Sequence, residues 1–193
     1  MYFVHGIELD NKVYCIFEYG IYFMKFIQPV MSPLDVVVLV KLALSDSALS
    51  QVSLARELVL SQSEISKSMS RSRYAGLLFD KDNQVMRQGL FDFIQYGVRY
   101  AFPQQPGPIV RGVATAHSAR PLSDHIQSDE PYVWPSSYGE VRGHSIAPLY
   151  PKVVDAAAKD PQLHEVLALI DALRVGRARE RNIAVDELKK RIC

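Results

Sequence analysis

The chain has 193 residues, of which 48% are hydrophobic and 22% are charged, and its 22 Lys and Arg balance 21 Asp and Glu to a formal net charge of +1. This composition is ordinary for a globular protein, and the length allows a hydrophobic core without disulfides or metals. The near-zero net charge excludes a uniformly basic molecule, so a nucleic-acid-binding surface would require local clustering of charge. The two cysteines, Cys15 and Cys193, form no disulfide framework and fit a cytoplasmic protein.

Residues 1–30 are unusually rich in Tyr and Phe. Two segments of β-favouring composition, residues 13–17 and 21–26, predict a short hairpin with Gly20 at its turn. An alternative is that the natural start is Met24 or Met31, so that residues 1–30 are an N-terminal extension.

The most apolar early stretch is residues 13–31. It contains Glu18, Lys25 and Gln28, which are costly inside a bilayer, so no membrane-spanning segment is expected. It is also a poor signal peptide, because Glu8 and Asp10 occupy the place of a positively charged region.

Three helices are predicted next. Ser32 and Pro33 suit the start of a largely buried helix that continues to Leu44. Residues 51–58 and 62–73 follow as a second and third helix. Ser61 and Glu64 have capping-box spacing, which fixes the start of the third helix.

Gly76 is expected to stop the third helix. Residues 80–83 are turn-like, and Val85 and Met86 form the predicted returning strand of a very short wing. Residues 87–100 then predict a helix with one apolar side, formed by Leu90, Phe91, Ile94 and Val98.

Residues 101–150 change in character, because most of the chain's prolines lie here or just beyond. Regular helix is not expected, and the interspersed apolar residues predict extended segments packed on the domain surface.

Residues 151–193 return to helix. Asp160 and Pro161 predict the start of one helix, and residues 184–192 predict a last one. The basic tail, residues 172–193, is interpreted either as a contact for phosphates or an acidic partner, or as a solvated helix face.

The segment SQVSLARELVLSQSEISKSMSR, residues 50–71, resembles the helix-turn-helix of bacterial transcription regulators, and especially the winged, MarR-like versions. Ala55 is small where the two helices approach, and inward Leu54 and Leu58 face Ile65 and Met69. The family usually has glycine at the first turn position. Here that residue is Val59, which predicts a turn of different shape because β-branched residues disfavour positive φ.

The resemblance implies that the third helix reads the major groove through its polar face. The expected DNA-binding residues are Gln62, Ser63, Ser66, Lys67, Ser70, Arg71 and Arg73. The first three lie nearest the helix start, where base edges are usually reached, and the cations further along are expected to meet phosphates.

The sequence therefore predicts a mainly α protein with a winged helix-turn-helix at residues 31–100, a Pro-rich packed extension at 101–150 and C-terminal helices at 151–193. We expect sequence-specific binding of double-stranded DNA, transcriptional regulation, and a homodimer that reads two half-sites. The apolar stripe Leu163, Val166, Leu167, Ile170 and Leu173 is either the dimer interface or an internal packing face. The alternative function is a protein-interaction module, such as an antitoxin-like partner.

An enzyme is not expected. The five histidines show no metal-ligand spacing, and nothing adjacent to His117 and Ser118 supplies a catalytic triad. No cofactor or metal is indicated. Two Arg-Gly pairs, at Arg111 and Arg142, are loop-like, and either bind an unidentified effector or only form turns.

Overall fold

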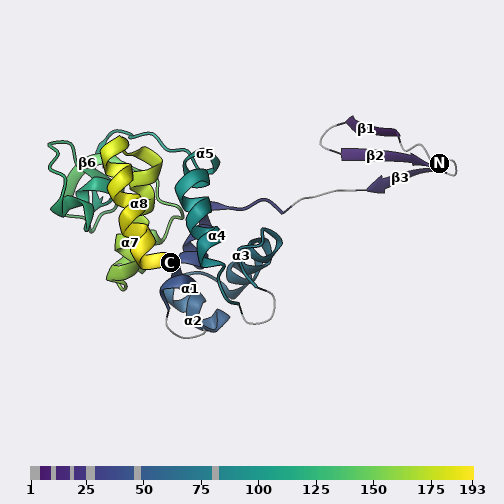
Figure 1. Cartoon of the computed structure of the whole chain (residues 1–193), viewed down its shortest axis with the longest axis horizontal. Helices are drawn as coiled ribbons and strands as arrows, with labels where there is room; N and C mark the ends of the chain where they lie inside the picture. Colours follow the sequence, from purple (N-terminus) through teal and green to yellow (C-terminus); the bar gives the residue numbers. More distant parts are fainter. Residues whose placement is uncertain (1–4, 10–11, 18–19, 25–28, 46–48, 80–82) are drawn as a thin grey trace. The chain divides into compact units, whose positions relative to one another are not determined.

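The computed structural model describes residues 5–9, 12–17, 20–24, 29–45, 49–79 and 83–193. The chain forms two compact units, Met1–Val30 and Met31–Cys193 (Figure 1). It is mainly helical, with small three-stranded sheets.

The first unit is an antiparallel sheet of three strands, β1 (His5–Leu9), β2 (Lys12–Phe17) and β3 (Gly20–Met24). The predicted hairpin is confirmed in β2 and β3, with Gly20 as the first residue of β3 opposite Phe17. Strand β1 was not predicted. Phe26, the expected end of the second strand, lies outside the described residues.

The second unit begins with the three predicted helices, α1 (Pro33–Leu44), α2 (Gln51–Glu57) and α3 (Gln62–Tyr74). In α1 the Asp35 carboxylate accepts a hydrogen bond from the Ser32 N–H at 2.7 Å, so Asp35 closes the start of the helix. Residues 36–40 of α1 are all completely buried. Such all-round burial requires cover on more than one side, which α3 and the later helix α7 (Pro161–Val175) provide.

The end of α3 follows the predicted glycine stop. Gly76 has φ of +71°, the Leu77 N–H donates to the Ser72 carbonyl at 2.9 Å, and the Gly76 N–H donates to the Arg73 carbonyl at 2.9 Å. Leu78 and Val85 then form a single antiparallel bridge. This bridge is compatible with the predicted short wing, and residues 80–82 of the predicted turn lie outside the described residues.

The helix predicted at residues 87–100 is a continuous rod in three parts: α4 (Arg87–Asp92), the π-helical turn η1 (Phe93–Gly97) and α5 (Val98–Ala101). Leu90, Phe91, Ile94 and Val98 are all buried, as the apolar pattern predicted.

Residues 101–150 contain more regular structure than predicted. Strand β4 (Ile109–Ala114) pairs antiparallel with both β5 (Tyr132–Pro135) and β6 (Val141–Ser145), and β5 pairs parallel with β6, so the three strands close on one another. The short 3₁₀ turns η2 (Ala116–Ser118) and η3 (Leu122–Asp124) lie between β4 and β5.

The interpretation of the two Arg-Gly pairs as loops was wrong, because they lie within β4 and β6. A β-carbon on Gly112 would collide with the Trp134 carbonyl, and one on Gly143 with the Pro131 carbonyl. These glycines therefore allow close approach of the backbones.

The C-terminal part comprises α6 (Val153–Ala157), which was not predicted, then α7, and α8 (Ala178–Ile192), which begins six residues earlier than predicted. Asp160 caps α7 as expected, since its carboxylate accepts from the Leu163 N–H at 3.0 Å. In the described part of the chain, no helix combines the length and apolar character needed to span a bilayer.

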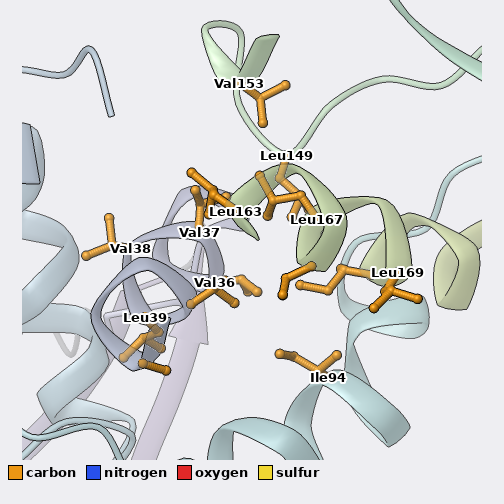
Figure 2. Packing of buried hydrophobic residues seen from close by; sticks show 14 of the residues in the cluster. Val36, Val37, Val38, Leu39, Ile94, Leu149, Val153, Leu163, Leu167 and Leu169 are labelled. Atoms are coloured by element: carbon orange, nitrogen blue, oxygen red, sulfur yellow. The ribbon is translucent and has the colours of Figure 1, made fainter. Parts of the chain in front are cut away.

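Helix α7 lies at the centre of the core. Its apolar stripe is buried within the single chain, which confirms the internal-packing alternative and excludes this stripe as a dimer interface. Figure 2 shows Leu163 and Leu167 of α7 facing Val36 and Val37 of α1.

A buried polar cluster joins α7 to the Pro-rich segment. The Asp171 carboxylate accepts hydrogen bonds from Thr115 Oγ1 at 2.8 Å, Trp134 Nε1 at 2.6 Å and Arg174 Nη1 at 2.7 Å. Arg174 also donates to the Phe102 carbonyl at 2.9 Å. Each group is thus satisfied without water, and the segments 31–100, 101–150 and 151–193 share one interior.

Candidate nucleic-acid interface

The turn between α2 and α3 places a valine in the left-handed region of backbone conformation that glycine adopts readily. Val59 has φ of +55°, and the Leu60 N–H donates to the Ala55 carbonyl at 2.8 Å, which closes the end of α2. The expectation that Val59 would avoid positive φ was therefore wrong. A non-glycine residue in this left-handed region carries about 1–2 kcal/mol of strain, so the surrounding packing holds Val59 in place.

One of the contacts that hold the turn comes from a distant segment. The Tyr150 hydroxyl donates to the Leu58 carbonyl at 2.9 Å, and both residues are buried. Burial raises the pKa of Tyr150, so its hydroxyl keeps the proton that it donates. The sequence analysis did not find this contact, because 92 residues separate the two partners.

The start of α3 is fixed by the predicted capping box. The Glu64 N–H donates to Ser61 Oγ at 3.2 Å, and the Glu64 carboxylate accepts from the Ser61 N–H at 2.9 Å and from Ser61 Oγ at 2.7 Å. The Ser61 hydrogen bonds lower the pKa of Glu64, with smaller contributions from Lys152 and Lys67. The negative charge is thus held at the helix start by groups of the chain itself.

The inner face of α3 contains Ile65, Ser68, Met69 and Ser72, all of which are buried. The inward positions of Ile65 and Met69 are confirmed. The two serines are small, which suits the close packing of α3 on α1 and α2.

The outer face is polar. Gln62, Ser63, Ser66, Lys67 and Ser70 are all exposed. Within the part of the chain that the structure describes, none of these five side chains has a hydrogen bond or an ion pair. Their donors and acceptors are therefore available to a partner molecule.

The structure gives Arg71 a different position from these five residues. Its Nε donates to Asp35 Oδ2 at 2.7 Å and its Nη2 to Asp35 Oδ1 at 2.6 Å, while the Asp35 side chain is 0% exposed. The hydrogen bond to Asp35 is the main reason that the pKa of Arg71 is raised. Arg71 thus joins α3 to α1 and does not belong to the polar outer face.

Arg73 is also engaged within the fold. Its Nη2 donates to Asn83 Oδ1 at 2.5 Å, which ties the end of α3 to the segment that precedes Val85. Arg73 is only partly exposed, so its position also differs from that of the five exposed residues.

The structure adds a cation that the sequence analysis missed. Lys152 lies close enough to Glu64 to contribute to its lowered pKa, as Lys67 does, so both lysines are near the start of α3. Lys152 is exposed and follows the segment that Tyr150 fastens to the turn. No local sequence signal reports this proximity.

The basic tail is partly neutralised within the chain. Arg174 pairs with Asp171, and Arg191 pairs with Glu165 and Glu187. Among the described residues, no group of three His, Cys, Asp or Glu side chains is arranged to hold a metal ion.

Comparisons of the chain with models of known protein families, with curated proteins and with solved structures found no match. The resemblance of residues 50–71 to the winged helix-turn-helix regulators therefore stays a prediction.

Proposed function

We propose that the protein binds double-stranded DNA in a sequence-specific manner by placing the N-terminal half of α3 in the major groove, and that it acts as a transcriptional regulator. The observation that carries this proposal is the division of α3 into two faces. One face is fully buried, and the other presents five exposed polar side chains without partners among the described residues.

The chemistry of the exposed face supports base recognition. The Gln62 amide offers a donor and an acceptor that match the edge of adenine, and the hydroxyls of Ser63 and Ser66 either donate or accept. Lys67 and Lys152, both near Glu64 at the helix start, supply positive charge for backbone phosphates.

The operator is first selected from a pool of random duplexes, and binding by variants is then measured over a range of salt concentrations. Gln62→Ala should lose about 1–3 kcal/mol on the selected site and little on random DNA. Lys67→Ala and Lys152→Ala should weaken binding to both, and each should reduce the slope of log K against log salt by about one unit.

Matched controls are Gln127→Ala and Lys189→Ala, because both residues are exposed and lie outside α3, in a loop and in α8 respectively. Neither control should change DNA affinity. If a folded protein with Gln62, Lys67 and Lys152 all changed to alanine retains wild-type affinity, α3 is not the reading element and the proposal fails.

We also propose that two copies bind together. A single reading helix makes few base contacts, and paired half-sites are the usual solution. Light scattering of the full chain with the selected duplex should give the mass of two copies per duplex. A single copy per duplex at micromolar concentration would contradict this.

A further inference from the structure

The arginines of the two Arg-Gly pairs lie opposite one another. Strands β4 and β6 are antiparallel, and their register places Arg111 directly opposite Arg142. Side chains opposite each other on an antiparallel pair share one face, with β-carbons only about 4.5–5.5 Å apart. Both arginines are exposed, so the strand pair presents two adjacent positive charges on its surface.

These charges are not neutralised within the fold. Arg111 Nε donates to the Gly139 carbonyl at 2.5 Å, which fixes the side chain but leaves its positive charge without a counter-ion. Among the described residues, Arg142 has no hydrogen bond or ion pair, and Glu140 has no ion pair with either arginine. Like charges directly opposite destabilise a strand pair, so this arrangement weakens the sheet unless an anion occupies it.

The same three side chains border an open space on the surface. Arg111, Glu140 and Arg142 line a surface hollow with a volume of about 490 Å³. The backbone beneath it is closely packed, because a β-carbon on Gly139 would collide with Gly112. The arginines therefore project from a rigid base, as a preformed binding site requires.

We infer that Arg111 and Arg142 bind the phosphate group of a small phosphorylated molecule. Two guanidinium groups match the charge and the several acceptor oxygens of a phosphate. Glu140 at the rim then accepts a hydrogen bond from a hydroxyl or amino group on the same ligand. This site is separate from the proposed DNA-binding face, since β6 lies at the far side of its unit from α3 in Figure 1.

The test titrates sodium pyrophosphate into the full chain at constant ionic strength, with binding followed by calorimetry. Wild-type protein should bind pyrophosphate, and Arg142→Gln should weaken binding at least about tenfold. Arg99→Gln is the matched control, because Arg99 is an exposed arginine on α5, and it should bind as wild type does. No binding by wild type, or equal binding by Arg142→Gln, would overturn the inference.

Thermal melting provides a second readout. Because Arg142 has no partner within the described residues, Arg142→Gln should melt no lower than wild type in the absence of pyrophosphate. Added pyrophosphate should raise the melting temperature of wild type by more than it raises that of the variant. A variant stabilised as strongly as wild type would contradict the site.

The DNA assay separates the two sources of phosphate. Arg142→Gln should bind the selected duplex as tightly as wild type. A loss similar to that of Lys67→Ala would show that the arginines contact the DNA backbone instead, and would overturn the small-molecule site. The pyrophosphate titration does not depend on DNA binding, so either proposal can fail while the other stands.

Discussion

The Asp35–Arg71 pair allows a direct test of how α3 is held. In Arg71→Ala, the Asp35 carboxylate loses two charge-assisted hydrogen bonds, at 2.6 and 2.7 Å, and keeps only the Ser32 N–H. Removing one partner of a buried ion pair costs about 3–5 kcal/mol. The Arg71 side chain is 25% exposed, so we expect a loss near the lower limit, about 3 kcal/mol. For a chain of this size, that loss lowers the melting temperature by about 6–12 °C.

The assay is urea unfolding followed by circular dichroism, combined with DNA binding at several salt concentrations. The double variant Asp35→Ala, Arg71→Ala should be more stable than Arg71→Ala alone, because it leaves no buried unpaired carboxylate. Arg56→Ala, at an exposed position of α2, should change the free energy of unfolding by less than about 0.5 kcal/mol.

Two results would refute this reasoning. One is a loss below about 1 kcal/mol in Arg71→Ala. The other is a salt slope for DNA binding that falls by about one unit at unchanged stability, since that would identify Arg71 as a phosphate contact.

Three further predictions concern stability measured by urea unfolding. Tyr150→Phe should lose about 1–3 kcal/mol, because it leaves the buried Leu58 carbonyl without its donor, and an unchanged midpoint would show that the hydrogen bond is dispensable. Val59→Gly should gain up to about 1 kcal/mol, since relief of the positive-φ strain exceeds the entropy that glycine adds to the unfolded chain, and a loss would show that the valine packing matters more. Burial is the largest single effect on the pKa of Lys41 and of Asp160, and it opposes both charges. Their hydrogen bond at 2.6 Å, together with Glu57 beside Lys41 and the backbone N–H groups of Leu163 and Gln162 beside Asp160, outweighs burial, so the pKa of Asp160 is lowered from 3.8 and that of Lys41 is raised from 10.5. Stability should therefore fall as the pH drops below about 3.8 through the lowered pKa of Asp160, and again as it rises above about 10.5 through the raised pKa of Lys41, whereas Lys41→Met should flatten both arms.

The elements that could be predicted from the sequence are those with local signals. The capping box at Ser61 and Glu64, the stop at Gly76 and the cap at Asp160 each depend on neighbours within a few residues, and all three are present. Helix capping is settled by the backbone groups of one turn, so a short sequence window contains the whole interaction.

The elements that were missed depend on distant partners. The closed sheet of β4, β5 and β6 joins strands separated by two 3₁₀ turns and loops, and its glycines resemble turn residues. A sequence does not distinguish a glycine required by positive φ from one required by a nearby backbone. Likewise, periodicity revealed the apolar stripe of α7 but not which surface covers it.

The proximity of Tyr150 to the α2–α3 turn, and of Lys152 to the start of α3, also depends on distant partners. Both residues lie beyond the Pro-rich segment, and only the tertiary fold brings them to the α2–α3 turn. Arg71, in contrast, was named from the sequence as a DNA-binding residue, and the tertiary fold instead pairs it with a distant carboxylate. The sequence assigned it to the polar face of the third helix, but the sequence of that helix contains no information about Asp35 on another helix.

The burial of residues 36–40 on all sides has a consequence for synthesis on the ribosome. Helix α1 emerges early, but α7, which covers part of it, begins only at Pro161. At 5–20 residues per second, this interval lasts on the order of ten seconds, during which a strip of valine and leucine stays uncovered. We therefore expect chaperones that bind apolar segments to bind the nascent chain. Messages truncated before α7 should yield aggregated or degraded fragments rather than a free-standing three-helix domain.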